Sequence, residues 1–482
     1  MHVYIGSACP WLDEHIKGFI QARVPNAVFF DNFEDFPLES EENFQWCDGW
    51  ELNRNFTVLN NAKKTGLINA YPSSDALARK DYLARVVDYW RAKRPDSILA
   101  THVPLTVRLS LDYAEYVDEA LTAADDLTLL YGLEENEALE PKDRTWWILK
   151  PALVDCGAGI RIFSTVDELA GYLELAEYEY DDDEDESTEE EEEEKWEKNS
   201  VTLSLPGLDS LDGLITTASS LSLSDEKAKA KQGQLMRAKK PQYVFKANGR
   251  IPSAQMREFV AQQYVVAIPP VEGKKWHVRA YALSVGRLKV HVFRELLALL
   301  ACENYQPPWE NPSLRSSLTN TALQDEDEFT ENESMRDFWS TAVPEDLIPS
   351  LGKNWKDNVW DQICEVTGDL FRAAAHTMAD KFTTVDKCFE LFAVDYLVDT
   401  KGQIWLLEVN ETPAFYNHGK AGPLALRLME SVVAVTLEHM GKVSEEKDDA
   451  EVRKRLVKVL DETDKLPKSN IAEILPEDSS FC

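Results

Sequence analysis

The stretch that decides the fold is Phe389–Ala414, FELFAVDYLVDTKGQIWLLEVNETPA. Its first part, Phe389–Asp399, is apolar on both of its faces, which is typical of a strand buried within a sheet. Turn-forming residues follow at 399–402, and Gln403–Asn410 then reads as a second strand. The stretch therefore predicts an antiparallel hairpin in the interior of the protein.

Three polar side chains stand in this hairpin. With a four-residue loop after Asp399, that residue faces Ile404, and the same register places Asp395 opposite Glu408. Asn410 shares a face with Glu408 because it lies two residues further along the strand. Opposed carboxylates in an apolar setting repel each other and are poorly solvated, so they favour a hard cation, typically Mg²⁺ with substrate phosphates. The alternative is an edge hairpin whose acids are solvated.

The bulk composition limits the classes of function. The chain has 482 residues and a net charge of −35, and twelve of its acidic residues fall between Asp181 and Glu194. Such a balance argues against direct binding of nucleic acid or of an anionic membrane surface. There is no long apolar run and no basic-then-apolar leader, so we expect neither a transmembrane helix nor a signal peptide.

The seven cysteines are scattered along the chain, and none forms a Cys-x-x-Cys pair. This spacing argues against a zinc site and against a disulfide scaffold. It predicts a reducing, cytoplasmic location. The C-terminal residues ending at Cys482 lack the spacing that prenylation requires.

The order of apolar segments predicts several domains of mixed α/β (α+β) class. Residues 1–31 begin as an α/β unit, with strands near 2–5 and 27–30 and a helix near 11–21. Residues 442–482 are interpreted as a charged tail that is part helical and otherwise loose. The acidic run and the Ser/Leu-rich stretch after it, about 177–225, are interpreted as a disordered insertion.

A lysine and a glycine loop follow one another in the central part. Thr145–Lys150 is a compact apolar strand that ends on the lysine, and the loop after it contains Gly157 and Gly159. Backbone amides of such a loop can close over phosphates, and a lysine at the strand end can neutralise them. Loops with two glycines are mostly ordinary turns, and a lone lysine is usually a surface residue. The combination with the acidic hairpin is what favours a phosphate site.

Residues 273–295 read as an antiparallel hairpin around a two-residue turn at Gly286 and Arg287. In that register Arg279 and Arg294 are cross-strand neighbours, to within one residue. Adjacent arginines in an apolar sheet repel unless an anion lies between them, and a phosphate or acyl phosphate is a suitable anion. The alternative is a structural pair bridged by nearby acids.

Taken in chain order, these segments resemble the tubulin–tyrosine ligase family of ATP-grasp ligases. Some of their sequences are similar to those of fungal-type members. The resemblance covers about residues 60–440. Its segments are LINAYPSSDALARKD (67–81), WILKP (147–151), GAGIRIFST (157–165), QQYVV (262–266), KKWHVRAY (274–281), FRE (293–295), SLTNTALQ (317–324), FELFAVDYLVD (389–399) and WLLEVNETPAF (405–415). The resemblance implies a three-part ATP-grasp fold, with an N-terminal α/β domain at 1–140, a central domain at 141–262 and a C-terminal domain at 263–441. It also implies that the nucleotide lies between the central and C-terminal domains.

The resemblance also implies roles for individual residues. The implied magnesium ligands are Asp395, Glu408 and Asn410. The implied catalytic pair, around the γ-phosphate and the acyl phosphate, is Arg279 and Arg294. The implied ATP-binding set is Lys150, Asp155, Gly157, Gly159, Gln262, Tyr264, Val265, Lys275, His277 and Asn320.

One position departs from the family pattern. The Lys-Phe-Asp-Ile-Arg of the animal enzymes reads Lys275-Trp276-His277-Val278-Arg279 here. The histidine replaces the acid that would contact nucleotide or substrate. We expect nucleotide binding to survive this change, while the choice of acceptor or amino acid differs.

The implied activity is ATP-dependent ligation, in which an acceptor carboxylate is phosphorylated and an amino group then attacks the acyl phosphate. Such chemistry needs positioning and charge neutralisation. The expected cofactors are ATP and Mg²⁺. The expected partners are a free amino acid (tyrosine, glutamate or glycine) and an acceptor protein, with the acidic tail of α-tubulin as the default. The enzyme itself is expected to be a monomer. An acidic acceptor requires a local cationic groove, for which the candidates are Arg161, Lys239, Lys240, Arg250, Lys274 and Lys275. The alternatives are the same chemistry on a non-tubulin acceptor and a nucleotide-binding scaffold without ligase activity.

Overall fold

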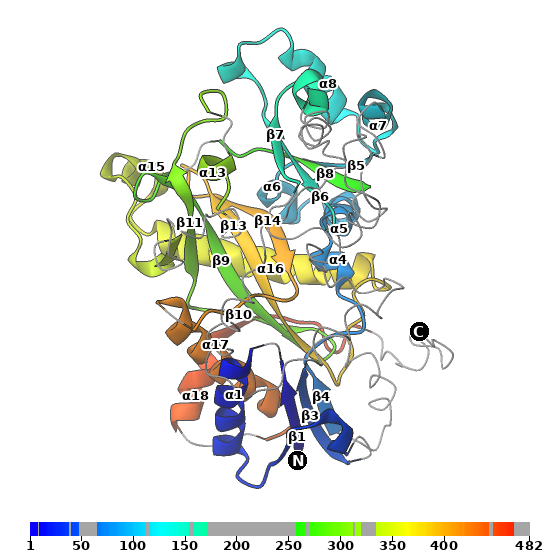
Figure 1. The fold of residues 1–482 in the computed structure, drawn as a ribbon, viewed down its shortest axis with the longest axis vertical. Coiled ribbons are helices and arrows are strands. Elements are labelled where there is room, and N and C mark those ends of the chain that lie inside the picture. Colours follow the sequence, from blue (N-terminus) through cyan, green and yellow to red (C-terminus); the bar gives the residue numbers. More distant parts are fainter. Residues whose placement is uncertain are drawn as a thin grey trace, which may run out of the picture.

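The computed structural model describes residues 1–7, 9–37, 40–47, 65–111, 116–153, 159–171, 257–266, 269–311, 314–319, 334–417, 419–442 and 447–466. Within these ranges three sheets form three units, which follow one another along the longest axis of the molecule (Figure 1). The predicted insertion at about 177–225 lies outside the described residues, as do Asp155, Gly157 and Asn320.

The N-terminal unit is a parallel sheet in the order β2-β1-β3-β4. Its strands are β1 (His2–Gly6), β2 (Val28–Phe30), β3 (Glu42–Cys47) and β4 (Thr65–Ile68). Helix α1 (Pro10–Arg23) buries Leu12, Ile16 and Ile20, which recur every four residues along one face. The strands and the helix predicted within residues 1–31 are confirmed.

The central unit is an antiparallel sheet in the order β5-β8-β6-β7. Its strands are β5 (Thr106–Ser110), β6 (Trp147–Pro151), β7 (Arg161–Phe163) and β8 (Glu258–Gln263). Helices α7 (Val117–Ala123) and α8 (Thr128–Asn136) share a hydrophobic core with the face of β6 that carries Trp147 and Leu149. The sheet includes β5, so its first strand lies before the predicted boundary at residue 140.

The C-terminal unit is a larger antiparallel sheet built around β9. One edge of β9 pairs with β10 and β11, and its other edge pairs with β13, which in turn pairs with β14. The strands are β9 (Lys274–Val285), β10 (Lys289–Phe293), β11 (Leu297–Asn304), β12 (Met335–Asp337), β13 (Phe389–Val398), β14 (Ile404–Asn410) and β15 (Leu456–Asp461).

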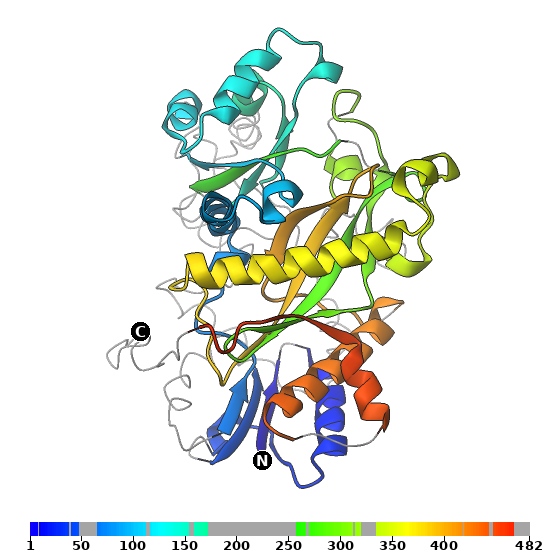
Figure 2. The ribbon, with the colours of Figure 1, turned by 180° about the vertical axis from the view of Figure 1, so that it is seen from behind.

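Two long helices cover this sheet. Helix α16 (Trp355–Thr377) runs across one face (Figure 2) and buries Val359, Ile363 and Val366 against it. Helix α17 (Ala421–His439) packs with the opposite face and with α1 of the N-terminal unit. The predicted charged tail is more regular than expected, because after α18 (Lys447–Lys454) it adds β15 to the sheet beside β10.

Strand β13 also joins the N-terminal unit to the sheet. Phe44 and Trp46 of β3 pack on Phe389, with ring centroids 5.7 and 5.4 Å away. The backbone amide of Tyr71 donates to the buried Glu390 carboxylate at 2.9 Å. All ten residues of β13 are buried, so the alternative of a solvated edge hairpin does not hold for this strand.

No helix in the described ranges combines the length and the apolar character needed to cross a bilayer. The five cysteines that the structure describes are all free thiols.

Candidate nucleotide and magnesium site

The acidic hairpin pairs as predicted at the residues that matter for a metal. Asp395 faces Glu408 across the β13–β14 ladder, and Asn410, two residues further along, pairs with Ala393. Asp395 is 2% exposed, and the Asn410 amide donates to its Oδ2 at 3.3 Å. The three side chains therefore form one polar group in an apolar sheet.

The turn length from which that pairing was predicted is wrong. Ile404 pairs with Val398 rather than with Asp399, because the turn is one residue longer than expected. A bulge then leaves Leu407 without a partner and returns the register to the predicted one at Asp395. Asp399 instead stabilises the turn, and its Oδ1 accepts hydrogen bonds from the backbone amides of Lys401 and Gln403.

Arg279 neutralises Asp395 directly. Its Nε donates to Oδ1 at 3.0 Å and its Nη2 to Oδ2 at 2.8 Å, which is the bidentate geometry that makes such pairs strong. Burial alone raises the pKa of Asp395, but Arg279 and then His277 hold that pKa below its ordinary value. The carboxylate is therefore ionised at neutral pH.

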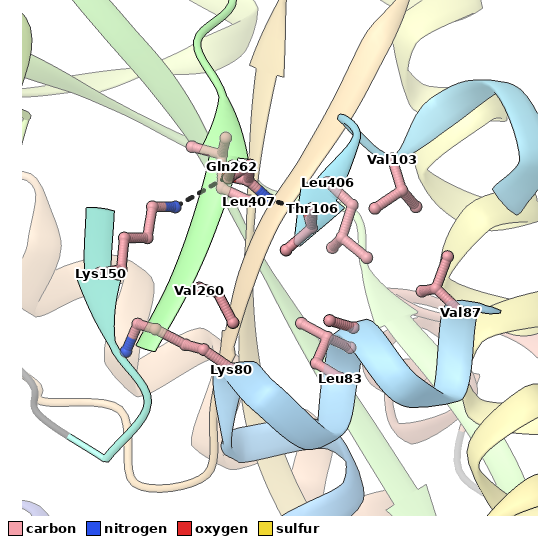
Figure 3. A pocket seen from close by; sticks show the side chains of 11 residues that line it. Lys80, Leu83, Val87, Val103, Thr106, Lys150, Val260, Gln262, Leu406 and Leu407 are labelled. Carbon is pink, nitrogen blue, oxygen red and sulfur yellow. Dashed lines mark hydrogen bonds between the residues drawn. The ribbon is translucent and has the colours of Figure 1, made fainter. Parts of the chain in front are cut away.

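Two lysines approach the acids, one from the central sheet and one from helix α5. Lys150 on β6 donates to Gln262 Oε1 at 2.9 Å, and Lys80 at the start of α5 (Lys80–Lys93) lies 3.7 Å from Glu408 Oε2. Both lysines line one small pocket with Thr106, which accepts from the Gln262 amide (Figure 3). Burial lowers the pKa of Lys150 to about 8, opposed by Glu408 and reinforced by Lys80.

A third lysine lies close by. Lys275 is buried, and its Nζ donates to the hydroxyl of Tyr264 at 2.7 Å. Burial lowers the pKa of Lys275 well below its ordinary value, and the charge of Lys150 lowers it further. Buried ammonium groups that destabilise one another are stabilised by a shared polyanion, so this arrangement suits the phosphates of a nucleotide.

His277 occupies the same face of β9 as Lys275 and Arg279. Its Nδ1 forms a hydrogen bond with Thr319 Oγ1, and its Nε2 lies 3.5 Å from Asp395 Oδ1. Within the described residues Nε2 is buried and makes no hydrogen bond. The position of the family acid is thus taken by a side chain that faces Asp395 and whose Nε2 makes no hydrogen bond within the described residues.

Arg294 does not join this group, so its predicted neighbour relation with Arg279 is wrong. The turn after β9 holds three residues, so Lys289 rather than Leu288 pairs with Val285. A one-residue change of register turns every later side chain to the other face. Arg294 accordingly lies over Trp339 and Trp360, at 4.1 and 4.4 Å from the ring centroids, and beside Asp357.

The remaining predicted residues are partly placed. Gln262 lies in the site, whereas the Tyr264 amide already donates to the Trp146 carbonyl at 2.8 Å and Val265 follows β8 without regular structure. Gly159 adopts a positive φ of 69°, which suits glycine at the end of its loop. Sequence reasoning missed Lys80 and Thr319 as site residues; each meets a partner far away in the sequence, and no local pattern marks such a contact.

The donor set fits a magnesium ion. Asp395, Glu408 and Asn410 offer carboxylate and amide oxygens, which are the hard ligands that Mg²⁺ prefers, and phosphates and water would complete its shell. Among the described residues no group of three or more His, Cys, Asp or Glu side chains gathers around a metal-sized space. The fit therefore depends on Asn410 as the third ligand.

The sequence profile of the tubulin–tyrosine ligase family matches residues 58–449, most of the chain. The chain belongs to this family. It is 36% identical over 381 residues to a probable tubulin–tyrosine ligase of Schizosaccharomyces pombe, covering 79% of this chain and 78% of that protein. It is 29% identical over 406 residues to the probable tubulin–tyrosine ligase PBY1 of Saccharomyces cerevisiae, covering 82% of this chain but 46% of PBY1. The chain thus spans less than half the length of that relative.

The fold is that of ATP-grasp enzymes. The crystal structure of the C-terminal domain of Pby1 from K. lactis, described as an ATP-grasp enzyme that interacts with the mRNA decapping enzyme Dcp2, matches with a TM-score of 0.57. The match covers 95% of this chain and 99% of the Pby1 chain at 20% identity. Both the predicted family and the predicted fold are confirmed, and membership in this family of ligases supports an ATP-dependent ligase.

Proposed function

We propose that this protein binds ATP with Mg²⁺ between the central and C-terminal sheets and joins an amino acid to a carboxylate of a protein. The observation that carries the proposal is the cross-strand pair Asp395–Glu408, faced by Lys150 of the central sheet and by Lys80 of helix α5. Acids and bases of opposite charge converge there from three separate parts of the chain. Such convergence suits a ligand with several negative charges and a cation.

Each side chain has a defined task in this scheme. Lys150 and Lys275 would bind and orient the phosphates, and Asp395, Glu408 and Asn410 would hold Mg²⁺, which neutralises the phosphate oxygens when bound. Arg279 keeps Asp395 ionised and oriented. ATP then transfers its terminal phosphoryl group to the acceptor carboxylate, ADP leaves, and the amino group displaces phosphate to form the amide.

The default acceptor in this proposal is the acidic tail of α-tubulin, and it is supported only as far as two relatives are named probable tubulin–tyrosine ligases. A mouse tubulin polyglutamylase, TTLL7, is 28% identical over 187 residues, covering 36% of this chain. Of the predicted cationic groove, Arg161 and Lys274 are described and partly exposed. Lys275 is buried within the nucleotide site instead. We expect the enzyme to act as a cytoplasmic monomer.

A second candidate is the same chemistry on an acceptor other than tubulin. His277 favours it, because a group that can carry positive charge stands beside Asp395 where the animal enzymes have an acid. An altered charge at that position changes which substrate groups the site can accommodate. A scaffold role without ligase activity is disfavoured by the full set of acids and lysines in the site.

The test is to incubate the purified protein with Mg·ATP, each labelled amino acid in turn and tubulin, and to measure labelled conjugate. The proposal predicts conjugate in the native protein and none in Glu408→Gln, with the exposed Glu365→Gln as a matched control that retains activity. The absence of conjugate with every amino acid would exclude tubulin as acceptor. A mass-spectrometric comparison of cellular proteins with and without the enzyme then decides whether another acceptor exists, and no difference there would refute the ligase itself.

A further inference from the structure

The central unit carries an acidic surface, whose charge is unsuited to binding phosphate. Residues 117–143, which contain α7 and α8 and are here called the acidic cap, hold nine acidic residues and a single base, Lys142. All nine acids are exposed. Within the described residues only Asp125 among them forms an ion pair, with Arg108. Arg144, directly after the cap, donates to the Leu139 carbonyl, so with Lys142 and Arg108 it offsets part of this charge and leaves an excess of negative charge on the cap.

The same surface also exposes several large apolar side chains. Seven large hydrophobic side chains are exposed in the described part of the chain, and four of them lie on or beside the acidic cap. Leu127 and Tyr131 lie four residues apart, and Glu135 continues the same stripe along α8. Tyr131 is 56% exposed, the largest value of the seven. The four are Tyr116, Leu127, Tyr131 and Leu139.

A groove of about 300 Å³ opens at this place, between α8 and the β6–β8 part of the sheet. Thr128, Gly132 and Glu135 of α8 form one side, and Trp147 of β6 and Gln263 of β8 lie on the other. Its volume is that of a small ligand pocket and is enough for one or two side chains of a peptide. The groove thus combines an acidic rim with an aromatic floor.

The floor contains an unused hydrogen-bond donor. Trp147 is 2% exposed, and its indole Nε1 has no acceptor within the described residues. A Cβ at Gly132 would lie 3.7 Å from Cζ2 and 4.0 Å from Nε1 of this ring, so the nitrogen faces the glycine of α8 that lines the groove. An unpaired buried N–H is costly, and a ligand carbonyl would satisfy it.

This groove is separate from the proposed nucleotide site. Side chains alternate between the two faces of a strand, so Trp147 and Lys150, three residues apart on β6, lie on opposite faces. Trp147 packs with α7 and α8, whereas Lys150 meets Gln262 and the acids of the C-terminal sheet. Binding at the groove leaves the nucleotide residues untouched.

We propose that the groove is a docking site for a cationic peptide segment of a partner protein. A lysine or arginine of the segment would pair with Glu135, a neighbouring apolar side chain would cover Tyr131, and a backbone carbonyl would accept from Trp147. The choice of a cationic occupant follows from the nine exposed acids. A neutral segment would gain nothing from their field, and an acidic segment would be repelled by it.

The test measures fluorescence anisotropy of a short labelled peptide in which lysine and arginine alternate with leucine, at physiological salt. A control peptide has glutamate in place of every base. Gly132→Leu fills the groove without changing charge and improves helix propensity, so it should fold and should weaken peptide binding about tenfold or more. Gly18→Leu is the matched control, because Gly18 is an exposed helix glycine with open space around it.

Two further variants separate the groove from the general charge of the chain. Gly132→Ala adds one methyl at ordinary contact distance from Trp147 and should retain binding. Glu135→Gln should weaken binding, whereas Glu365→Gln on α16 should not. If Gly132→Leu binds the peptide as tightly as the native protein, or if Glu135→Gln and Glu365→Gln weaken it equally, the attraction is non-specific and the proposal is overturned.

Discussion

At Lys150 the protein holds an ammonium group in a place from which water is excluded. Burial lowers its pKa to about 8, against an ordinary value of 10.5. Only the charged form binds phosphates, so we expect the affinity for Mg·ATP to fall as the pH rises through 8. At pH 9 about a tenth of the group remains protonated, and binding should be about tenfold weaker than at pH 7.

Calorimetric titration of Mg·ATP at several pH values checks this, with Lys150→Arg as the control that stays charged and flattens the dependence. The lowered pKa of Lys150 can also be tested in the unliganded protein, through the pH dependence of its free energy of unfolding. Between pH 8 and pH 10.5 the folded state binds fewer protons at Lys150 than the unfolded state does, so stability should rise with pH in that window. A native affinity that is equal at pH 7 and pH 9 would contradict the placement of Lys150 at the phosphates.

Single residues show what the sequence could and could not reveal about the site. Asp395, Glu408 and Lys150 were predictable because charged groups inside apolar strands are costly and so stand out. Lys80 was not, because its contact with Glu408 joins two segments that are distant in sequence. The hydrogen bond between His277 and Thr319 is another such contact, formed between a strand and the segment after a short helix.

Between strands, the position of a turn decides which face a side chain occupies. Arg279 lies on the β9 face that carries Asp395, whereas Arg294 follows β10 on the face covered by α16. We therefore expect Arg279→Gln to lower the rate of conjugation by about a hundredfold or more, since the ionised Asp395 loses its bidentate partner. Arg294→Gln should leave the rate within about twofold.

Arg294→Gln should instead lower the free energy of unfolding by about 1 kcal/mol, because it loses two aromatic contacts at a partly exposed position. Turnover and urea unfolding of the two variants, measured side by side, check both expectations. An equal loss of turnover in both variants would place Arg294 at the substrate after all.

The acidic hairpin β13–β14 shows which features of a structural element can be predicted from its sequence pattern. Burial of β13 and the pairing of Asp395 with Glu408 follow from apolar character and spacing. The longer turn and the bulge at Leu407 do not, since neither leaves a clear mark in the sequence. The two departures cancel at Glu408, so the predicted pairing is correct although the predicted turn is not.

At the scale of the whole molecule, the order of the units was easier to predict from the sequence than the residues at which each unit begins and ends. β5 pairs with β8 although a long stretch of chain separates them, and only that pairing assigns β5 to the central sheet. The tail behaves in the same way, because β15 is recognisable as a strand only once β10 lies beside it. Long-range pairing of this kind depends on tertiary packing rather than on local propensity.

The central claim is that the acids of the β13–β14 hairpin hold the magnesium of a bound nucleotide, and it concerns the central and C-terminal sheets together. The most direct test is calorimetric titration of ATP, with and without Mg²⁺, into the native protein, Glu408→Gln and the control Glu365→Gln. We predict that Mg²⁺ strengthens ATP binding to the native protein and to the control, and that this gain falls about tenfold or more in Glu408→Gln. An equal gain from Mg²⁺ in all three proteins would contradict the account.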